Sequence, residues 1–396
     1  MSSATATGSP RWLFSACLAA VLVPTVAAFA GAVSFHGLGP DSSYALGVSP
    51  DGSVVVGRGN PGIGSQGYRW TADAGITPIG VAPGDVHSEA NGASSDGAVI
   101  VGASSDSGAN RYTPFRWTKT SGIQPLGTIA GGGFRNIAVD VSADRTVIAG
   151  NAGVLPWRWT ASGGMAGLDP LAGQIEAVTR AISDDGSTIV GAGKTSHGGV
   201  AFRWSLAGGM QDLGDLPGAS VSGGARAVNA DGSVVVGYGL SDNGIEAFRW
   251  TANGGMSALG DLPGGNFNSA ATAVSADGSI VYGDSSAGPG ATSAFVWDAA
   301  HGMRDLATVL TNEYGMSLGG WRLYTVTGTS ADGLTIVGQG FNAAGASESF
   351  VVMLPEPGSA AATSAVAWLA LHRRRRSRKQ SALAALLPAG PFPQSR

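Results

Sequence analysis

Few side chains in this sequence have the types and spacing that catalysis, metal binding or phosphate binding requires. Four histidines lie between the two ends of the chain, and no two are spaced as metal ligands on one element: His36, His87, His197 and His301. Neither a Gly-x-Ser-x-Gly nucleophile turn nor a Gly-x-x-x-x-Gly-Lys-Ser/Thr phosphate loop is present. We therefore predict no cofactor and no metal. Whether the chain is an enzyme stays open, because paired carboxylates from separate segments would leave no linear motif.

Aspartates followed by glycine recur along the chain and could suggest calcium. A calcium loop needs several carboxylates within about 12 residues. Each of these turns has a single aspartate, apart from the pair Asp184 and Asp185. We therefore interpret the aspartates as turn residues that hydrogen-bond to their own backbone.

The same aspartates reveal a repeat of about 46 residues. Seven copies are marked by Asp51, Asp96, Asp144, Asp185, Asp231, Asp277 and Asp332. The tryptophans of six copies follow the same period, at Trp70, Trp117, Trp159, Trp204, Trp250 and Trp297. A repeat of this length with several short apolar runs predicts an all-β chain folded as a seven-bladed β-propeller.

Each repeat is expected to form four strands, a to d. In one copy they are residues 225–229, 234–237, 247–251 and 256–260, with Asp-Gly and Asn-Gly-Gly turns after a and c. The last copy has strands at 323–330, 334–338 and 349–354 but lacks strand d. Residues 33–39 resemble a spare strand d, so we expect the N-terminal strand to complete the last blade and close the ring.

Strand order places the a–b and c–d turns at one end of the ring, here called the turn face. The b–c loops and d–a connections lie at the other end, the loop face, and vary most between copies. Because function concentrates in variable loops on a rigid scaffold, we expect a ligand there. The long connection 307–320 is its most distinctive segment, although it could simply be a longer crossover. The predicted ligand-binding residues are Asn312, Glu313, Tyr314 and Trp321.

A repeated arginine stands before the tryptophan in five copies: Arg69, Arg116, Arg158, Arg203 and Arg249. We expect each to be half-buried between blades and paired with a carboxylate such as Asp215 or Asp261, with a ligand-facing role as the alternative. The repeat segment 31–354 carries 15 Lys and Arg and 26 Asp and Glu, a net charge of −11. That balance argues against nucleic acid as a partner.

The two ends of the chain differ in composition from the repeats. Residues 1–30 have Arg11, an apolar run and the small residues Ala28 and Ala30, which predict a cleaved signal peptide and export. The single cysteine, Cys17, lies within it. At the other end, Pro355, Glu356 and Pro357 precede a small, apolar stretch at 358–371. Fourteen residues are short for a transmembrane helix, which needs roughly 20, so the stretch predicts transient membrane association as a weak anchor or sorting signal. A basic cluster then follows at Arg373, Arg374, Arg375 and Arg376.

These features resemble two known groups. The Pro-Glu-Pro motif, apolar stretch and arginine cluster of residues 355–379 are similar to the PEP-CTERM sorting signal of Gram-negative bacteria, followed here by a tail at 380–396 that we expect to be disordered. That resemblance implies recognition by exosortase-type machinery and export to the cell surface or extracellular matrix. The repeats resemble the HAF family of extracellular repeats, through runs such as Ala247-Phe248-Arg249-Trp250.

Three functions fit these observations. The first is a non-catalytic surface or matrix protein that binds polysaccharide or another envelope partner. The second is a carbohydrate-active hydrolase or lyase that uses carboxylates near the propeller channel, and the third is a structural surface component. An aromatic platform on the loop face would favour the first, clustered carboxylates there the second, and a featureless face the third.

Overall fold

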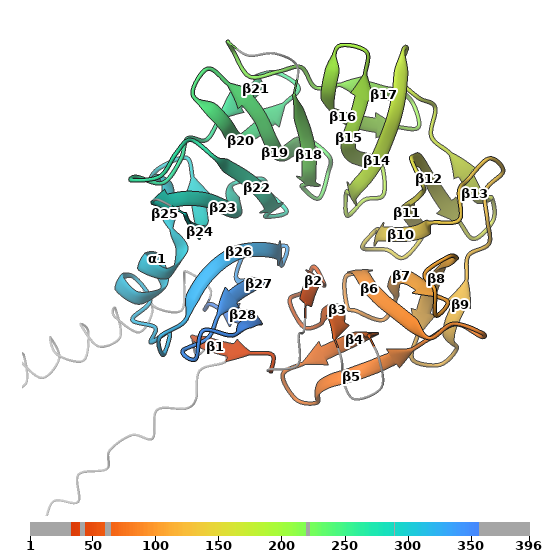
Figure 1. Ribbon diagram of the computed structural model, residues 1–396, viewed down its shortest axis with the longest axis horizontal. Helices are drawn as coiled ribbons and strands as arrows, with labels where there is room; N and C mark the ends of the chain where they lie inside the picture. The colour runs from red at the N-terminus through yellow and green to blue at the C-terminus, as the bar shows by residue number, and fades with distance from the viewer. Residues whose placement is uncertain (1–32, 40–43, 60–64, 219–221, 289, 356–396) are drawn as a thin grey trace, which may run out of the picture.

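A computed structural model describes residues 33–39, 44–59, 65–218, 222–288 and 290–355. Seven four-stranded antiparallel sheets stand around a central axis and form a closed ring (Figure 1). The prediction of a seven-bladed β-propeller is therefore confirmed.

The four strands of each blade run from the axis outward. The innermost strands, a, are β2 (Tyr44–Val48), β6 (His87–Ala93), β10 (Asn136–Val141), β14 (Gln174–Ile182), β18 (Gly223–Val228), β22 (Ser269–Val274) and β26 (Arg322–Thr329). Strands b are β3 (Val55–Gly59), β7 (Ile100–Ser105), β11 (Val147–Ala152), β15 (Thr188–Thr195), β19 (Val234–Ser241), β23 (Ile280–Gly288) and β27 (Thr335–Phe341). Strands c are β4 (Gln66–Thr71), β8 (Tyr112–Thr118), β12 (Leu155–Thr160), β16 (Gly198–Ser205), β20 (Gly244–Thr251), β24 (Ala291–Asp298) and β28 (Ser347–Met353). The outer strands, d, are β5 (Gly75–Gly80), β9 (Gly122–Pro125), β13 (Gly164–Gly167), β17 (Gly209–Asp212), β21 (Gly255–Ala258), β25 (Gly302–Asp305) and β1 (Ser34–Gly37).

The N-terminal strand closes the ring as predicted. Strand β1 pairs antiparallel with β28, from Ser34 opposite Met353 to Gly37 opposite Phe350. Blade 7 is thus built from both ends of the described chain, β26-β27-β28-β1. This pairing covers the edge of β28 that an open array would leave exposed.

A glycine in strand b faces a large aromatic residue in strand c in every blade. In blade 6, Gly283 lies opposite Phe295, and a Cβ on Gly283 would come within 2.0 Å of the Ala270 carbonyl oxygen and 2.7 Å of the Phe295 ring. The aromatic residues are all essentially buried: Tyr68, Phe115, Trp157, Phe202, Phe248, Phe295 and Phe350. The glycines therefore leave the space beside the neighbouring strand that these rings occupy.

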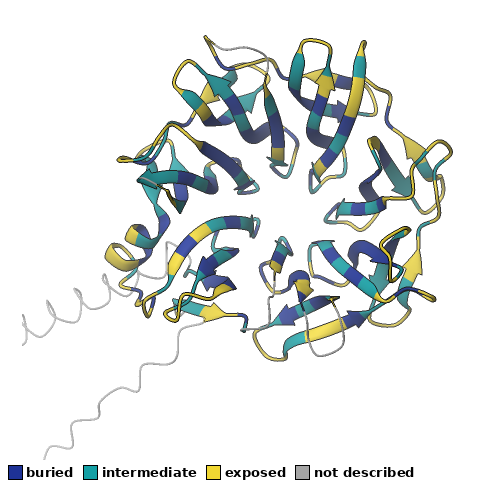
Figure 2. Cartoon of the chain, viewed as in Figure 1, coloured by how far each residue is buried: buried dark blue, intermediate teal, exposed yellow. Residues whose placement is uncertain are grey.

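The hydrophobic core consists of seven clusters, each between two adjacent blades. One cluster joins Val54 and Val56 of blade 1 to Ala90, Ile100 and Phe115 of blade 2. Buried residues consequently follow the interiors of the sheets, whereas exposed residues lie mostly in the loops and outer strands (Figure 2). The large aromatic residues of strands c therefore form core between blades.

The Asp-Gly turns hold the ring together at its turn face. In blade 6, Asp277 accepts hydrogen bonds from the Ser275 hydroxyl at 2.6 Å and the Ser279 backbone N–H at 2.9 Å. Backbone N–H groups also donate from each turn to the carbonyl of the next, for example Ala276 to Ala331 at 2.8 Å and Ala331 to Pro50 at 2.7 Å. Seven such bonds form a continuous belt around the axis. The hydrogen bonds that Asp277 accepts within its own turn confirm the turn-capping role predicted for the aspartates.

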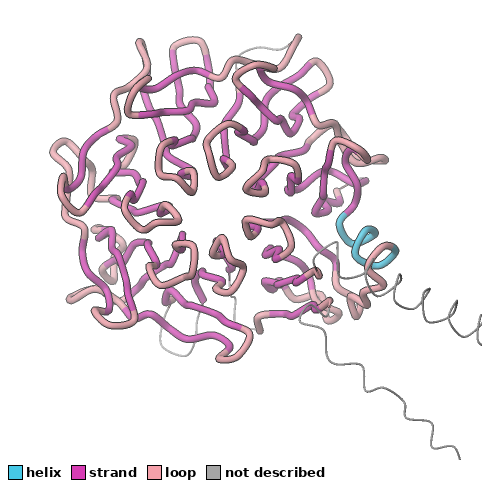
Figure 3. Tube along the Cα trace, turned by 180° about the vertical axis from the view of Figure 1, so that it is seen from behind, coloured by secondary structure: helices cyan, strands magenta, loops and turns pink. Residues whose placement is uncertain are grey.

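Two details differ from the sequence-based expectations. A short helix, α1 (Leu306–Asn312), lies on the outer side of the ring between blades 6 and 7, where no helical pattern was expected (Figure 3). The repeated arginines are half-buried as expected, but none forms an ion pair within the described part of the chain. Arg203 instead donates to the Thr188 hydroxyl, and Arg249 to the Gly278 carbonyl. The carboxylate of Asp261 accepts from Leu262, Asn268 and Ser285 instead.

Candidate functional site

The axis of the ring is a polar channel with a cavity of about 450 Å³. The innermost strands of all seven blades line it. Each of these strands has a β-bulge at the same repeat position, between, for example, Ala90 and Gly92. The extra residue of a bulge is released from pairing in its own sheet and can be aimed elsewhere.

Three bulge residues bond to the next blade. Asn91 donates to the Ala138 carbonyl at 2.9 Å, Thr272 to the Val326 carbonyl at 2.6 Å, and Thr327 to the Ala45 carbonyl at 2.9 Å. The bulge residues of blades 4 and 5 differ, because Arg180 and Arg226 are exposed in the channel wall. The same repeat position thus joins blades in one part of the ring and carries positive charge in another.

Asp140 places a carboxyl group with an altered pKa in this wall. It accepts hydrogen bonds from the backbone N–H groups of Val141 at 2.8 Å and of Ile182, in the next blade, at 3.2 Å. Burial raises its pKa to about 7 despite these bonds, and the neighbouring charge of Asp184 adds to the shift. Asp184 also lines the channel, near the turn face, and its own pKa is raised chiefly by burial.

The loop face carries most of the large apolar side chains that the ring leaves exposed. Nine of the ten exposed large hydrophobic residues in the described chain lie within two residues of the start of a strand a, in a b–c loop, or in the first two residues of a strand c. They are Tyr44, Val86, Phe134, Val154, Leu155, Ile175, Ile245, Phe267 and Tyr324, and we call them the loop-face apolar ring. The tenth, Leu206, lies in a c–d turn on the turn face.

Arginines stack on aromatic rings of the same face. The guanidinium of Arg58 lies 5.2 Å from the ring centre of Tyr44, and that of Arg135 lies 5.3 Å from the ring centre of Tyr112. On blade 7, Arg322 lies 5.0 Å from the Phe341 ring. These contacts fix the rings and place positive charge beside exposed apolar surface.

The structure separates the four residues predicted to bind a ligand. Asn312 and Glu313 line a cavity of about 480 Å³ beside blade 6, at the end of α1. Tyr314 and Trp321 pack instead against the hydrophobic cluster between blades 6 and 7. The Trp321 ring lies edge-on to Phe35 of β1, with 5.1 Å between ring centres.

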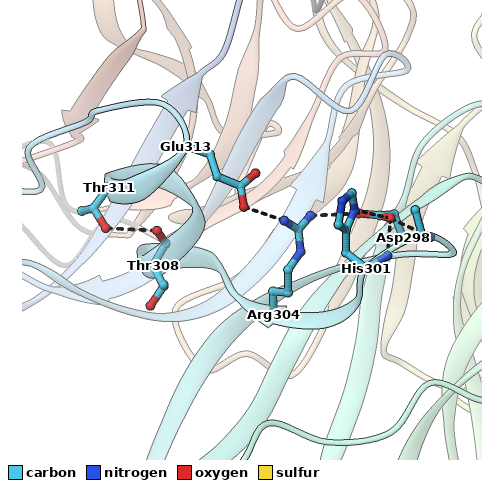
Figure 4. A network of polar contacts seen from close by, with 7 residues as sticks. Asp298, His301, Arg304, Thr308, Thr311 and Glu313 are labelled. Atoms are coloured by element: carbon cyan, nitrogen blue, oxygen red, sulfur yellow. Dashed lines mark hydrogen bonds and ion pairs between the residues drawn. The ribbon is translucent and has the colours of Figure 1, made fainter.

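Glu313 belongs to a chain of ion pairs on the outside of blade 6 (Figure 4). Its carboxylate accepts from Arg304 at 2.6 Å, and Arg304 also donates to Asp298 at 2.8 Å. Asp298 in turn contacts the His301 ring at 2.8 Å. Burial opposes ionisation of Asp298, but the hydrogen bonds from His301 and Ala300 leave its pKa lowered overall.

The connection 307–320 also has a clear packing role. Val309, Leu310, Met316 and Leu318 are buried in the cluster between blades 6 and 7. The Asp305 carboxylate caps α1 by accepting from the Thr308 N–H at 2.7 Å. The connection therefore acts as a crossover that covers the closing blade, which was the alternative weighed for this segment.

Sequence reasoning missed the loop-face apolar ring. Phe134 and Phe267 each lie in a glycine-rich connection, two residues before a strand a. A large aromatic residue in such a connection was the signal. The predicted signal-peptide residues Ala28 and Ala30 and the sorting residues Glu356, Pro357 and Arg373 to Arg376 lie outside the described residues. Pro355 follows the end of β28.

Comparison with known proteins supports the fold alone. No protein-family model and no curated protein sequence matches the chain. Among solved structures, an oligogalacturonate lyase in complex with manganese is similar at 13% identity and a TM-score of 0.52, covering 83% of this chain and 95% of that one. An oligogalacturonate lyase from Vibrio parahaemolyticus matches at 12% identity and a TM-score of 0.53, over 82% and 97% of the two chains. The virginiamycin B lyase of Staphylococcus aureus matches at 14% identity and 0.52, over 81% and 99%.

Proposed function

We propose that this protein is an exported, non-catalytic propeller that binds an extracellular polysaccharide or another envelope partner through its loop face. The loop-face apolar ring carries this proposal. Among the described residues, nine exposed large apolar side chains on one face, against one on the other, favour an interaction site on that face. The opposite face has one such residue among those described, Leu206, so the asymmetry points to a partner on the loop face.

The chemistry of the loop face suits a saccharide. Aromatic side chains can cover the apolar faces of sugar rings, and neighbouring polar groups can bond their hydroxyls. Tyr44 and Tyr324 are each 43% exposed and offer both an apolar ring and a hydroxyl. The stacked Arg58 adds hydrogen-bond donors next to Tyr44.

Paired variants test the site. We would replace Phe134 and Phe267 together by serine, since these rings are 72% and 47% exposed. The control is Leu206→Ser on the turn face, where the side chain is 78% exposed. On columns of immobilised neutral polysaccharides from bacteria and plants, the double variant should lose retention and the control should keep it. Equal retention of all three proteins would contradict a site on the loop face.

A second function, carbohydrate hydrolysis or elimination, is favoured by one observation. Asp140 lies in the channel wall with a pKa raised to about 7 by burial, which suits a proton donor or acceptor near neutral pH. Oligosaccharide released from the column by the wild type, and not by Asp140→Asn, would establish this alternative. Its hydrogen bonds to Val141 and Ile182 give Asp140 a structural role that requires no catalysis.

Export and sorting rest on the two ends of the chain. Residues 1–30 and 355–379 have the composition of a signal peptide and of a PEP-CTERM-like signal. No helix in the part of the chain that the structure describes is long and apolar enough to cross a membrane. In a Gram-negative host with exosortase, we expect the protein at the cell surface or in the matrix. Replacing Arg373 to Arg376 with alanine should stop delivery, and unchanged delivery would contradict this route.

A further inference from the structure

A second cavity lies between blades 1 and 2 on the turn face, away from the loop-face apolar ring. Its volume is about 610 Å³, and the strands and turns of both blades line it, together with the a–b turn of blade 3. Four cationic residues contribute to its lining: Arg69, Arg116, Lys119 and Arg145. Asp96 is the one acidic residue among the lining residues. This cluster contrasts with the net charge of −11 carried by segment 31–354, which has 15 basic and 26 acidic residues.

Arg145 departs from the repeat at a position where its backbone conformation favours glycine. It follows the turn aspartate and has φ of 71°. The other six repeats have glycine there, with φ between 62° and 76°: Gly52, Gly97, Gly186, Gly232, Gly278 and Gly333. Residues with a Cβ are disfavoured in this left-handed region. Blade 3 therefore tolerates an unfavourable backbone conformation while placing a guanidinium in the cavity.

Lys119 departs from the repeat independently. It lies two residues after Trp117, where other copies have alanine or leucine: Ala72, Ala161, Leu206, Ala252 and Ala299. Lys119 comes from a c–d turn of blade 2, and Arg145 from an a–b turn of blade 3. Two changes on different blades thus add positive charge to one cavity.

Most of this positive charge has no counter-ion. Among the described residues, Arg69, Arg116 and Lys119 make no side-chain hydrogen bond or ion pair. Arg145 bonds to Asp96, and the pKa of Asp96 is lowered by the Ala98 N–H and then by Arg145. The corresponding arginines of blades 4 and 5 donate to Thr188 and Gly278. The donors around this cavity therefore remain available to a ligand.

We propose that this cavity binds a carboxylate-bearing sugar unit of an acidic saccharide. Its volume is in the range of small-ligand sites. Arg69 and Arg116 can offer paired donors to a carboxylate, and Lys119 a point charge. Pro78 and Trp117 add apolar surface for the carbon face of a sugar ring. A polyanion of nucleic-acid size would instead meet the acidic remainder of the body.

The repeat itself supplies the test variants. Arg145→Gly and Lys119→Ala each restore the residue found in other copies, so both should fold. Lys194→Ala is the charge-matched control, since Lys194 is an exposed residue of β15 in blade 4. The probes are uronate oligosaccharides prepared from alginate and neutral maltooligosaccharides of the same length. Affinity is measured by calorimetry on residues 31–354 and on the full chain.

We expect the wild type to bind the uronate and not the neutral probe. Each cavity variant should weaken uronate binding about tenfold or more, as expected for loss of a charge-assisted contact. Binding should also weaken with salt, while Lys194→Ala stays unchanged. Equal affinity in wild type and cavity variants, or equal binding of both probes, would overturn the proposal. So would competition by inorganic sulfate as strong as that by uronate, since this would indicate a general anion site. If the Phe134 and Phe267 double variant loses uronate binding and the cavity variants keep it, this site is overturned and the loop-face proposal stands.

Discussion

The backbone N–H of Ala331 donates to the carbonyl of Pro50 at 2.7 Å, although 281 residues separate them in sequence. This bond joins the turn of blade 7 to that of blade 1 and completes the belt of turns around the axis. Strand β1 closes the ring a second time, at its outer edge, by pairing with β28. Two contacts between residues far apart in sequence therefore close the ring. One lies on the inner side of blade 7 and the other at its outer edge.

The outer closure should be sensitive to Phe35. Its half-buried ring contacts Trp321 at 5.1 Å and Phe350 at 5.9 Å between centres. We expect Phe35→Ala to lower the free energy of unfolding by about 2 kcal/mol, less than for a fully buried phenylalanine. His36→Ala, at an exposed position in the same strand, should change it by less than about 0.5 kcal/mol. Urea unfolding measures the free energy of unfolding of both variants. Equal losses in the two variants would show that β1 adds little to closure.

The turn glycines should differ according to what lies beside them. Gly97 has φ of 62°, and a Cβ there would lie 2.3 Å from a Val54 methyl of the preceding blade. Gly75 has φ of 64° and open space around the same position. We expect Gly75→Ala to cost about 1 kcal/mol for the backbone alone. Gly97→Ala should cost about 3 kcal/mol, because overpacking is added.

Thermal and urea unfolding of this pair of variants would separate the two effects. The unfolded-state contribution is the same for both substitutions, so it cancels in the comparison. A similar loss of stability in the two variants would contradict the packing of turn glycines against the neighbouring blade.

Asp140 should make stability depend on pH. Its pKa of about 7 in the folded protein lies above the value of about 3.9 for an unfolded aspartate. The folded state thus binds this proton more tightly, and the resulting stability is complete below about pH 4 and is lost as pH rises through about 7. The free energy of unfolding of the wild type relative to Asp140→Asn should therefore fall across this window. A difference that does not change with pH would contradict burial of the ionisable carboxyl.

The architecture was predictable because the same pattern of strands and turns recurs in seven copies. The turn aspartates and the spare strand at residues 33–39 were enough to give blade number and closure. Helix α1 was missed although Leu306, Val309 and Leu310 have helical spacing, because seven residues form too short a pattern to stand out. The ion pairs expected for Arg203 and Arg249 depended on how adjacent blades stack, which no single repeat specifies.

The binding surfaces were harder to predict, for a related reason. Phe134, Phe267 and Tyr324 lie in different blades, and only the closed ring brings their strand ends to one face. The emphasis on Asn312 to Trp321 followed from the length of one connection, and that length mainly serves packing between blades 6 and 7. Arg145 was visible in the sequence as the one non-glycine at its repeat position, but its significance required φ and the cavity beside it.

Retention on polysaccharide columns is the decisive test of a non-catalytic binding site on the loop face. Residues 31–354 would be applied to immobilised bacterial and plant polysaccharides, and retained protein and released sugar would be measured in the same samples. We predict retention on at least one neutral polysaccharide without release of sugar, and loss of that retention in the Phe134→Ser and Phe267→Ser double variant. Release of oligosaccharide would contradict a non-catalytic function, and retention of the double variant on that neutral polysaccharide would contradict binding by the loop face.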